Sequence, residues 1–281
     1  MPASELDDLI TTAERLSPER SPAQALELNQ QVLQLDPTNA AAHVRLARAY
    51  QSQREFAEAK AACQEALRLN PGSTVAKGRL QRISEEWELA KEAQATSTWD
   101  DAFQRGVEQK ADEYAGQAIA YLWRAVELST SRWQSVACRT ALGAAYRALK
   151  DPLSLERAAA QYELVLQHVP DDLPAKKGLA AVLRDQGELS QARRLYEQVL
   201  AVAPNDSHAL NGLAGVLHDA GDEVGAQERF KQSGRPPFVR RPSWLRGLVK
   251  HLPPLQSYAE WHYQPAQHTD LREPGVGCSS R

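Results

Sequence analysis

One stretch of 34 residues recurs along the chain and decides its fold: AAAHVRLARAYQSQREFAEAKAACQEALRLNPGS at residues 40–73. It aligns without gaps with LPAKKGLAAVLRDQGELSQARRLYEQVLAVAPND at residues 173–206. A shorter copy, SHALNGLAGVLHDAGDEVGAQERFKQSG, follows at once from Ser207. An internal period of this length is typical of stacked copies of one helical unit.

The copies place the same kinds of residue at the same positions. The first half has leucine, alanine and then a large residue one turn later: Leu46, Ala47, Tyr50; Leu179, Ala180, Leu183; Leu213, Ala214, Leu217. The second half has alanine and, one turn later, a thiol or an aromatic ring: Ala59, Cys63; Ala192, Tyr196; Ala226, Phe230. Small residues let two antiparallel helices approach closely, and the large ones fill the remaining volume. Glycine suits the end of a first helix and proline stops a second helix, as at Gly187, Gly221, Pro71 and Pro204.

These residues resemble the tetratricopeptide repeat in period, alternation and closing proline. The resemblance implies an all-α fold, a right-handed α-solenoid of antiparallel helix pairs, that holds a peptide or protein partner on its concave side. Weaker copies extend the array, so that the expected repeats are residues 6–37, 40–73, 99–130, 131–170, 173–206 and 207–233.

The middle of the chain departs from the repeat. Residues 74–95 have the apolar spacing of one helix, but no second helix of the repeat follows. We therefore expect two blocks, residues 1–95 and 99–234, and a tail at residues 235–281. Four of the six tryptophans fall near the junction: Trp87, Trp99, Trp123 and Trp133. Either they pack this junction, or one or two of them line a pocket for a partner side chain.

The expected partner contacts are the positions between the packing residues of the first helices. They are Arg45, Arg48, Gln51, Arg79 and Arg82 in the first block, and Arg147, Lys177, Arg184, His208, Asn211 and His218 in the second. Both sets are rich in basic residues. Because arginine binds carboxylates bidentately, one interpretation is an acidic ligand or a terminal carboxylate. The other is that these charges solvate exposed helix faces.

Some members of the family hold a terminal carboxylate with a set of lysines and asparagines. Val44, Arg45, Arg48 and Gly178 stand where such residues would be sought. The sequence does not reproduce the set, so the resemblance does not extend to that specificity.

The tail is basic. Residues 235–281 carry seven lysines and arginines against three acids, whereas the whole chain has a net charge of −3. Arg240, Arg241, Trp244 and Arg246 are its candidate contacts. Three interpretations are open: the tail covers the last repeat, it binds a protein (its own groove or a second copy included), or it contacts nucleic acid or an anionic membrane.

The sequence lacks the motifs of common active sites. It contains no GxSxG, HExxH or CxxC, and its seven histidines are dispersed. We therefore expect no enzyme, no cofactor and no metal. Cys63 and Cys138 are expected to be small buried residues. The apolar runs are shorter than the ~20 residues that span a bilayer, and without a secretory signal or a disulfide framework we expect a cytoplasmic protein.

Overall fold

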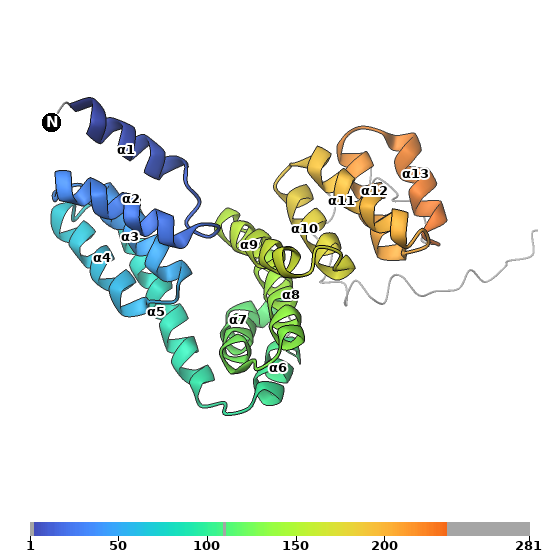
Figure 1. Ribbon diagram of the computed structural model, residues 1–281, viewed down its shortest axis with the longest axis horizontal. Coiled ribbons are helices and arrows are strands. Elements are labelled where there is room, and N and C mark those ends of the chain that lie inside the picture. The colour runs from blue at the N-terminus through green and yellow to red at the C-terminus, as the bar shows by residue number, and fades with distance from the viewer. Residues whose placement is uncertain (1–2, 109–110, 235–281) are drawn as a thin grey trace, which may run out of the picture. The chain divides into compact units, whose positions relative to one another are not determined.

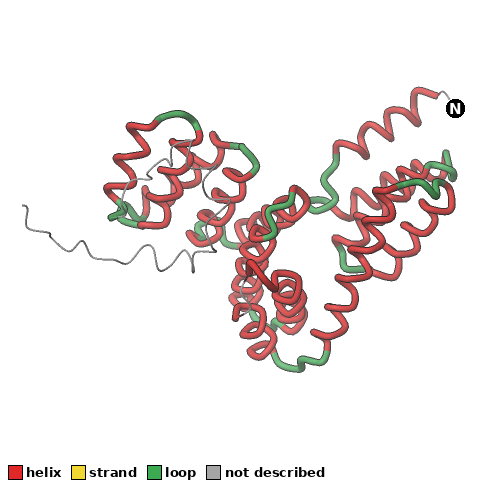
Figure 2. The backbone as a smooth tube through the Cα atoms, turned by 180° about the vertical axis from the view of Figure 1, so that it is seen from behind, coloured by secondary structure: helices red, strands yellow, loops and turns green. Residues whose placement is uncertain are grey.

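The computed structural model describes residues 3–108 and 111–234, and this part of the chain is all-helical (Figure 1). The first five of its thirteen helices are α1 (Ala3–Arg15), α2 (Pro22–Leu35), α3 (Ala40–Ser52), α4 (Phe56–Leu69) and α5 (Thr74–Gln94). The other eight are α6 (Trp99–Glu108), α7 (Ala111–Leu128), α8 (Arg132–Ala148), α9 (Pro152–His168), α10 (Leu173–Asp185), α11 (Leu189–Val202), α12 (Ser207–Asp219) and α13 (Glu223–Gln232). Consecutive helices are joined by short loops and pack on one another, except that α6 packs on α7 and not on α5 among the described residues (Figure 2). The predicted all-α solenoid of helix pairs is confirmed.

Most first helices of the repeats begin at a polar side chain that caps them. The caps accept a hydrogen bond from a backbone N–H three residues later, which satisfies one of the free donors of a helix start. Asn39 accepts from Ala42 at 2.9 Å, Asp172 from Ala175 at 2.7 Å, and Asp206 from Ala209 at 2.8 Å. The repeat boundaries are therefore fixed locally, by residues that the 34-residue period places in register.

The first helices end in a residue with a left-handed backbone. Gly187 and Gly221 have φ of 85° and 87°, as the sequence predicts. Arg54, at the same position of the repeat at residues 40–73, has φ of 64°, and Lys150 has φ of 55° after α8. Glycine adopts this conformation without steric cost, whereas a residue with a Cβ atom does not.

Tyrosines of the second helices pack against glycines of the first helices. A Cβ atom on Gly178 would overlap the ring of Tyr162, and one on Gly143 would lie 2.6 Å from Cζ of the same ring. A Cβ on Gly212 would overlap the ring of Tyr196. The tyrosine rings thus occupy the space that a side chain would take, and the contacts at Gly178 and Gly212 join one repeat to the next.

The buried residues form two large cores. The first core joins α3, α4 and α5 and includes Leu46, Cys63 and Ile83. The second core extends from α7 to α13 and includes Leu142 and Leu179. A small cluster of Ala93, Ala120 and Tyr121 joins α5 to α7. Helix α5 thus packs on α4 before it and on α7 after it. The division into two blocks, which was predicted from residues 74–95, stays a prediction.

The first helices of successive repeats pack on one another. Helix α10 contacts both α8 and α12, whereas the second helices α9, α11 and α13 are not packed together in this way in the described part of the chain. Because the closer-packed row of a solenoid lies on its concave side, α8, α10 and α12 form the inner row.

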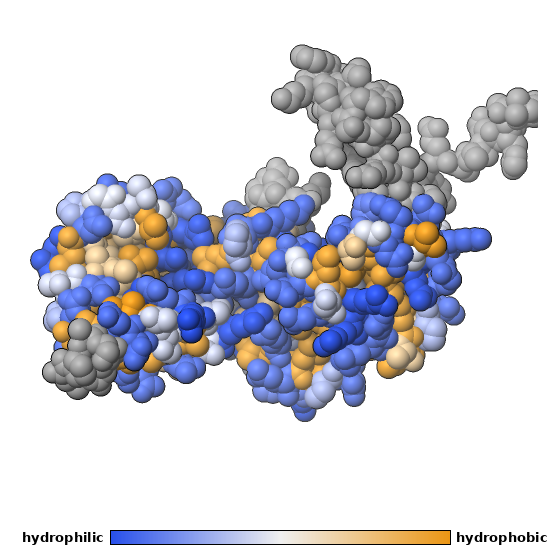
Figure 3. Space-filling view, turned by 90° about the horizontal axis from the view of Figure 1, so that it is seen from above, coloured by the Kyte–Doolittle hydropathy of each residue, from blue (hydrophilic) through white to orange (hydrophobic). Residues whose placement is uncertain are grey.

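The described residues on the face drawn in Figure 3 are mostly hydrophilic. Figure 3 shows one face, on which hydrophobic residues form small patches among polar ones. Cys63 and Cys138 are fully buried, as predicted. Within residues 3–108 and 111–234, no helix combines the length and the apolar character that crossing a membrane requires.

Candidate partner-binding surface

The predicted contacts of the inner row lie beside acids of the next repeat. Nε of Arg147 in α8 donates to Asp185 in α10 at 2.6 Å, and Nε of Arg184 in α10 donates to Asp219 in α12 at 2.5 Å. Lys177 pairs with Asp206 at 2.7 Å. The number of basic residues in the sequence therefore overstates the positive charge of this surface, because each of these residues lies beside an acid of the neighbouring repeat.

In the described hydrogen bonds of Arg147 and Arg184, the donor is Nε alone. A guanidinium has five N–H donors, so four remain on the two Nη atoms of each residue. Both side chains are about one-third exposed. The inner row thus presents partly accessible arginines at equivalent places on α8 and α10.

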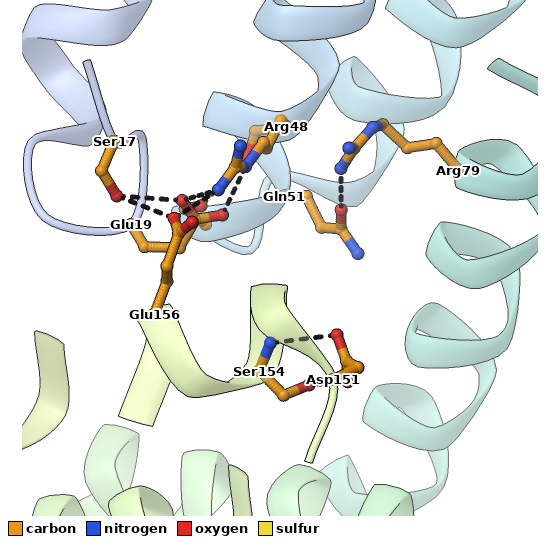
Figure 4. A network of polar contacts seen from close by, with 9 residues as sticks. Ser17, Glu19, Arg48, Gln51, Arg79, Asp151, Ser154 and Glu156 are labelled. Atoms are coloured by element: carbon orange, nitrogen blue, oxygen red, sulfur yellow. Dashed lines mark hydrogen bonds and ion pairs between the residues drawn. The ribbon is translucent and has the colours of Figure 1, made fainter. Parts of the chain in front are cut away.

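Two of the predicted contacts of the first block, Arg45 and Arg48, are partly buried and paired with acids. Arg48 in α3 donates to both carboxylate oxygens of Glu19, at 2.8 and 2.6 Å, and to Glu156 in α9 at 2.5 Å (Figure 4). The Glu19 side chain is only 1% exposed. Arg45 donates to Asn29 at 2.9 Å and lies 3.3 Å from Glu14. These arginines hold helices together whether or not they also contact a partner.

Gln51 and Arg79 form a further buried pair. Nη1 of Arg79 in α5 donates to Oε1 of Gln51 in α3 at 3.3 Å (Figure 4). Burial lowers the pKa of the Arg79 guanidinium, and the nearby cation Arg48 acts in the same direction. Arginine nevertheless stays charged at neutral pH.

The remaining predicted contacts are more accessible. Arg82 and His208 are exposed. Asn211 is partly buried and accepts a hydrogen bond from Ser233, and His218 lies 3.1 Å from Glu223. The predicted tail contacts Arg240, Arg241, Trp244 and Arg246 lie outside the described residues, as do the interpretations that depend on them.

A pocket lies between α3, α5, α7, α8 and α9. Its open space is about 520 Å³, including the part at its mouth that is open to solvent. We call it the junction pocket; its walls include Gln51, Arg54, Glu86, Trp123, Tyr146 and Arg157. Trp123, one of the four tryptophans near the predicted junction, therefore lines a pocket. Its Nε1 donates a hydrogen bond to the Tyr146 hydroxyl at 2.9 Å. Trp99 instead stacks on Phe103 with ring centroids 4.8 Å apart.

Arg157 is a buried charge of this pocket. It is 8% exposed, and its Nη1 donates to Glu86 in α5 at 3.0 Å. Burial opposes its charged form, but the charges of Glu86, Tyr146 and Glu19 and the hydrogen bond to Glu86 together outweigh burial, and the pKa of Arg157 lies above its usual value. The guanidinium is therefore a permanent cation at the wall of the pocket.

Four buried nitrogens of the described residues have no hydrogen-bond partner: Arg45 Nη2, Gln51 Nε2, Arg79 Nε and Arg157 Nη2. All four are donors, and they come from α3, α5 and α9. Buried polar groups are nearly always hydrogen-bonded, because leaving one without a partner costs about 1–3 kcal/mol. The buried side-chain groups that lack a partner among the described residues are thus all donors.

Arg54, Glu86 and Arg157 are not among the contacts predicted from the sequence. Glu86 and Arg157 are separated by 71 residues, and no local pattern brings them together. Arg54 did carry a signal, because the aligned copies have Gly187 and Gly221 at its position. A large cation where the repeat otherwise has glycine is a departure that the alignment could have revealed.

The chain matches a family model described as tetratricopeptide repeat at residues 19–85, 154–214 and 183–235. Among solved structures it is similar to YrrB, described as a TPR protein with an unusual peptide-binding site, with 15% identity, coverage of 81% of this chain and 100% of that chain, and a TM-score of 0.36. It is also similar to the Cut9–Hcn1 hetero-tetramer of APC/C, with 15% identity, coverage of 83% of this chain and a TM-score of 0.42. The match covers 54% of that second chain, so this protein spans about half its length. Comparison with curated proteins finds no match.

The family assignment rests on the sequence matches, which together cover just over half of the chain. The helix pairs, the tyrosine–glycine contacts between repeats and the left-handed turn after the first helix agree with it. The fold is that of a scaffold for protein–protein interaction, and the chain belongs to the tetratricopeptide repeat family.

Proposed function

We propose that the protein is a scaffold that holds an acidic segment of a partner protein against its first helices. The observation that carries the proposal is the excess of donors: each buried side-chain nitrogen or oxygen that lacks a partner among the described residues is a nitrogen of arginine or glutamine. A ligand that satisfies such groups must bring acceptors, and an ionised carboxylate offers about four acceptor sites.

The inner row supports the same chemistry. The described hydrogen bonds of Arg147 and Arg184, on consecutive first helices, use Nε and leave the Nη donors without one. A hydrogen bond from a charged donor contributes about 1.5–3 kcal/mol, which is about tenfold to more than a hundredfold in affinity. An extended segment crossing α8 and α10 would meet both arginines.

Selection of peptides from a random library displayed on phage tests the proposal, because it requires no identified partner. The expected result is a set of binders enriched in aspartate and glutamate. A set without acidic enrichment, or no binders at all, would overturn the proposal.

A matched pair of variants locates the binding. Arg147→Gln with Arg184→Gln removes two charges from the inner row and should weaken the selected peptides at least about tenfold. Arg193→Gln is the control, because Arg193 also pairs through Nε with one carboxylate, that of Glu197 at 2.7 Å, but lies in the second helix α11. Equal affinity for the wild type and both variant proteins would contradict a site on the inner row.

A further inference from the structure

Arg54 stands where the repeat favours glycine. Its φ of 64° is left-handed, and the equivalent positions of two other repeats are Gly187 and Gly221. A residue with a Cβ atom is disfavoured there, and such residues concentrate at functional sites because the surrounding structure holds them in place. The unusual backbone places an arginine at the junction pocket, whose wall it forms.

The Arg54 side chain is fixed by aromatic rings. Its guanidinium carbon lies 5.1 Å from the ring centroid of Phe56 and 5.3 Å from that of Trp123. Both contacts are within cation–π range. Its closest described carboxylate is Glu127, with Nε 3.9 Å from Oε1, and burial lowers the pKa of the guanidinium. Arg54 is thus a partly desolvated cation without a short ion pair in the described residues.

Two other residues that line the junction pocket have a buried donor nitrogen without a hydrogen-bond partner among the described residues. They are Gln51, which is 3% exposed, through its Nε2, and Arg157 through its Nη2. Each residue is already fixed through another atom, since Gln51 accepts from Arg79 and Arg157 donates to Glu86. The remaining donors are therefore held in place before any ligand arrives, which lowers the entropy cost of binding.

We propose that the junction pocket binds one carboxylate group of a protein ligand, with Arg54, Gln51 and Arg157 as its donors. This proposal rests on the proposed function, since it assigns the anchor of the acidic segment. The side chains of Ile119 and Trp123 would cover the carbon atoms next to the carboxylate. The group can come from an acidic side chain or from a chain terminus, and both present the same two oxygens.

The charges around the pocket favour a single carboxylate over a polyanion such as nucleic acid. Glu19 and Glu86 line the pocket, and Glu127 lies beside Arg54. These acids would repel further negative charge, whereas one carboxylate finds the donors that they leave unused. The pocket thus selects a ligand with one anionic group surrounded by neutral ones.

The test compares Arg54→Gly with Lys150→Gly in the full chain. Both substitutions remove one positive charge and place glycine at a left-handed position after a first helix, and Lys150 does not line the pocket. Both variants should fold, because glycine suits this backbone. Arg54→Asn is a second neutral variant, since asparagine tolerates the left-handed region.

The probes are small molecules observed through the indole N–H signal of Trp123 in NMR spectra. N-acetylglutamate α-amide carries only a side-chain carboxylate, N-acetylalanine carries only a terminal one, and N-acetylglutamine α-amide is the neutral control. We expect a saturable shift with at least one of the carboxylates and none with the neutral probe. Arg54→Gly and Arg54→Asn should reduce that affinity at least about tenfold, and Lys150→Gly should keep it.

The proposal is overturned if neither carboxylate shifts the signal, if the neutral probe binds equally, or if the Arg54 variants bind as the wild type does. Its failure is distinguishable from that of the proposed function. If the phage-selected acidic peptides bind Arg54→Gly normally but lose affinity for the Arg147→Gln and Arg184→Gln protein, only the pocket is wrong. If small carboxylates bind the pocket but no acidic peptides are selected, only the proposed function is wrong.

Discussion

Arg157 in α9 donates to Glu86 in α5 across 3.0 Å, although 71 residues separate them in the sequence. The pair joins a helix of the first core to a helix of the second, and it is surrounded by further pairs between the same regions. Ser17 donates to Glu156 at 3.1 Å, and Arg20 lies 3.2 Å from Glu163. Polar contacts therefore connect the early helices to α9, whereas the apolar connection between the two cores runs through α5 and α7.

Glu86→Gln should destabilise the protein, because it leaves the Arg157 charge buried without its carboxylate. Removing one partner of a fully buried pair costs about 3–5 kcal/mol, and the partial exposure of Glu86 reduces the expected loss to about 2 kcal/mol. Urea denaturation measures this loss in the free energy of unfolding. Glu85→Gln is the neighbouring control, since Glu85 is exposed and, among the described residues, accepts a hydrogen bond from Gln81 alone. Equal stability of the two variants would show that the buried pair does not stabilise the fold.

Gly178→Ala should lower stability by about 1–3 kcal/mol, since its new methyl group would overlap the Tyr162 ring. Gly78→Ala is the matched control, because a Cβ there meets nothing within 4 Å in α5. That variant should gain up to about 1 kcal/mol from helix propensity. The midpoint temperatures of thermal unfolding should therefore shift in opposite directions for the two variants. A shift of both midpoints in the same direction would contradict the tyrosine–glycine packing.

Asp206 links stability to pH. Partial burial opposes its charge, but the hydrogen bonds from Lys177 and from the Ala209 amide outweigh burial and lower its pKa. Stabilisation from a lowered acid pKa is present above the unfolded value of about 3.9 and is lost as the pH falls through the folded value. Asp206→Asn keeps the cap of α12 but loses the charge. We expect it to lower the free energy of unfolding by up to about 1 kcal/mol near pH 6 and by little at pH 3.

The control for this pH dependence is Asp172→Asn. Asp172 caps α10 in the same way, and no ion pair of its side chain occurs among the described residues. Denaturation midpoints measured from pH 3 to pH 7 should separate the two variants. The account of Asp206 is wrong if its asparagine variant loses as much stability at pH 3 as at pH 6.

Cys63 and Cys138 should be inert thiols in the folded protein. Both are fully buried. Burial raises the pKa of Cys63 to about 11, and burial also raises the pKa of Cys138 above its usual value. Since the thiolate is the reactive form, a Cys278→Ser variant should not react with a thiol reagent at pH 8 until it is unfolded. Two thiols should then be titrated in denaturant. Fast labelling of the native variant would contradict the packing of α4 and α8.

The repeated parts of this fold could be predicted from the sequence because the signals are local. The caps Asp172 and Asp206, and the turns at Gly187 and Gly221, each lie within a few residues of the helix end that they determine. The period of 34 residues then brings every such signal into register. The helix pairs follow from these local features and do not depend on distant contacts.

The candidate site could be predicted only in part, because its charges pair across the sequence. Arg48 was expected to face a partner, yet its carboxylates come from Glu19 and from Glu156, which is 108 residues away. Arg157 and Glu86 belong to no motif, and a burial pattern alone does not show that a guanidinium lacks a partner at one nitrogen. Arg54 is the exception: its importance could be predicted from the sequence, because arginine stands where two aligned repeats have glycine.

The position of a bound acidic peptide tests the central claim most directly. A phage-selected acidic peptide carrying a nitroxide label would broaden the NMR signals of amides close to it. The account predicts that amides of the inner helices α10 and α12 are broadened more than those of the outer helices α11 and α13. Stronger broadening of α11 and α13 would contradict the claim that the first helices hold the partner.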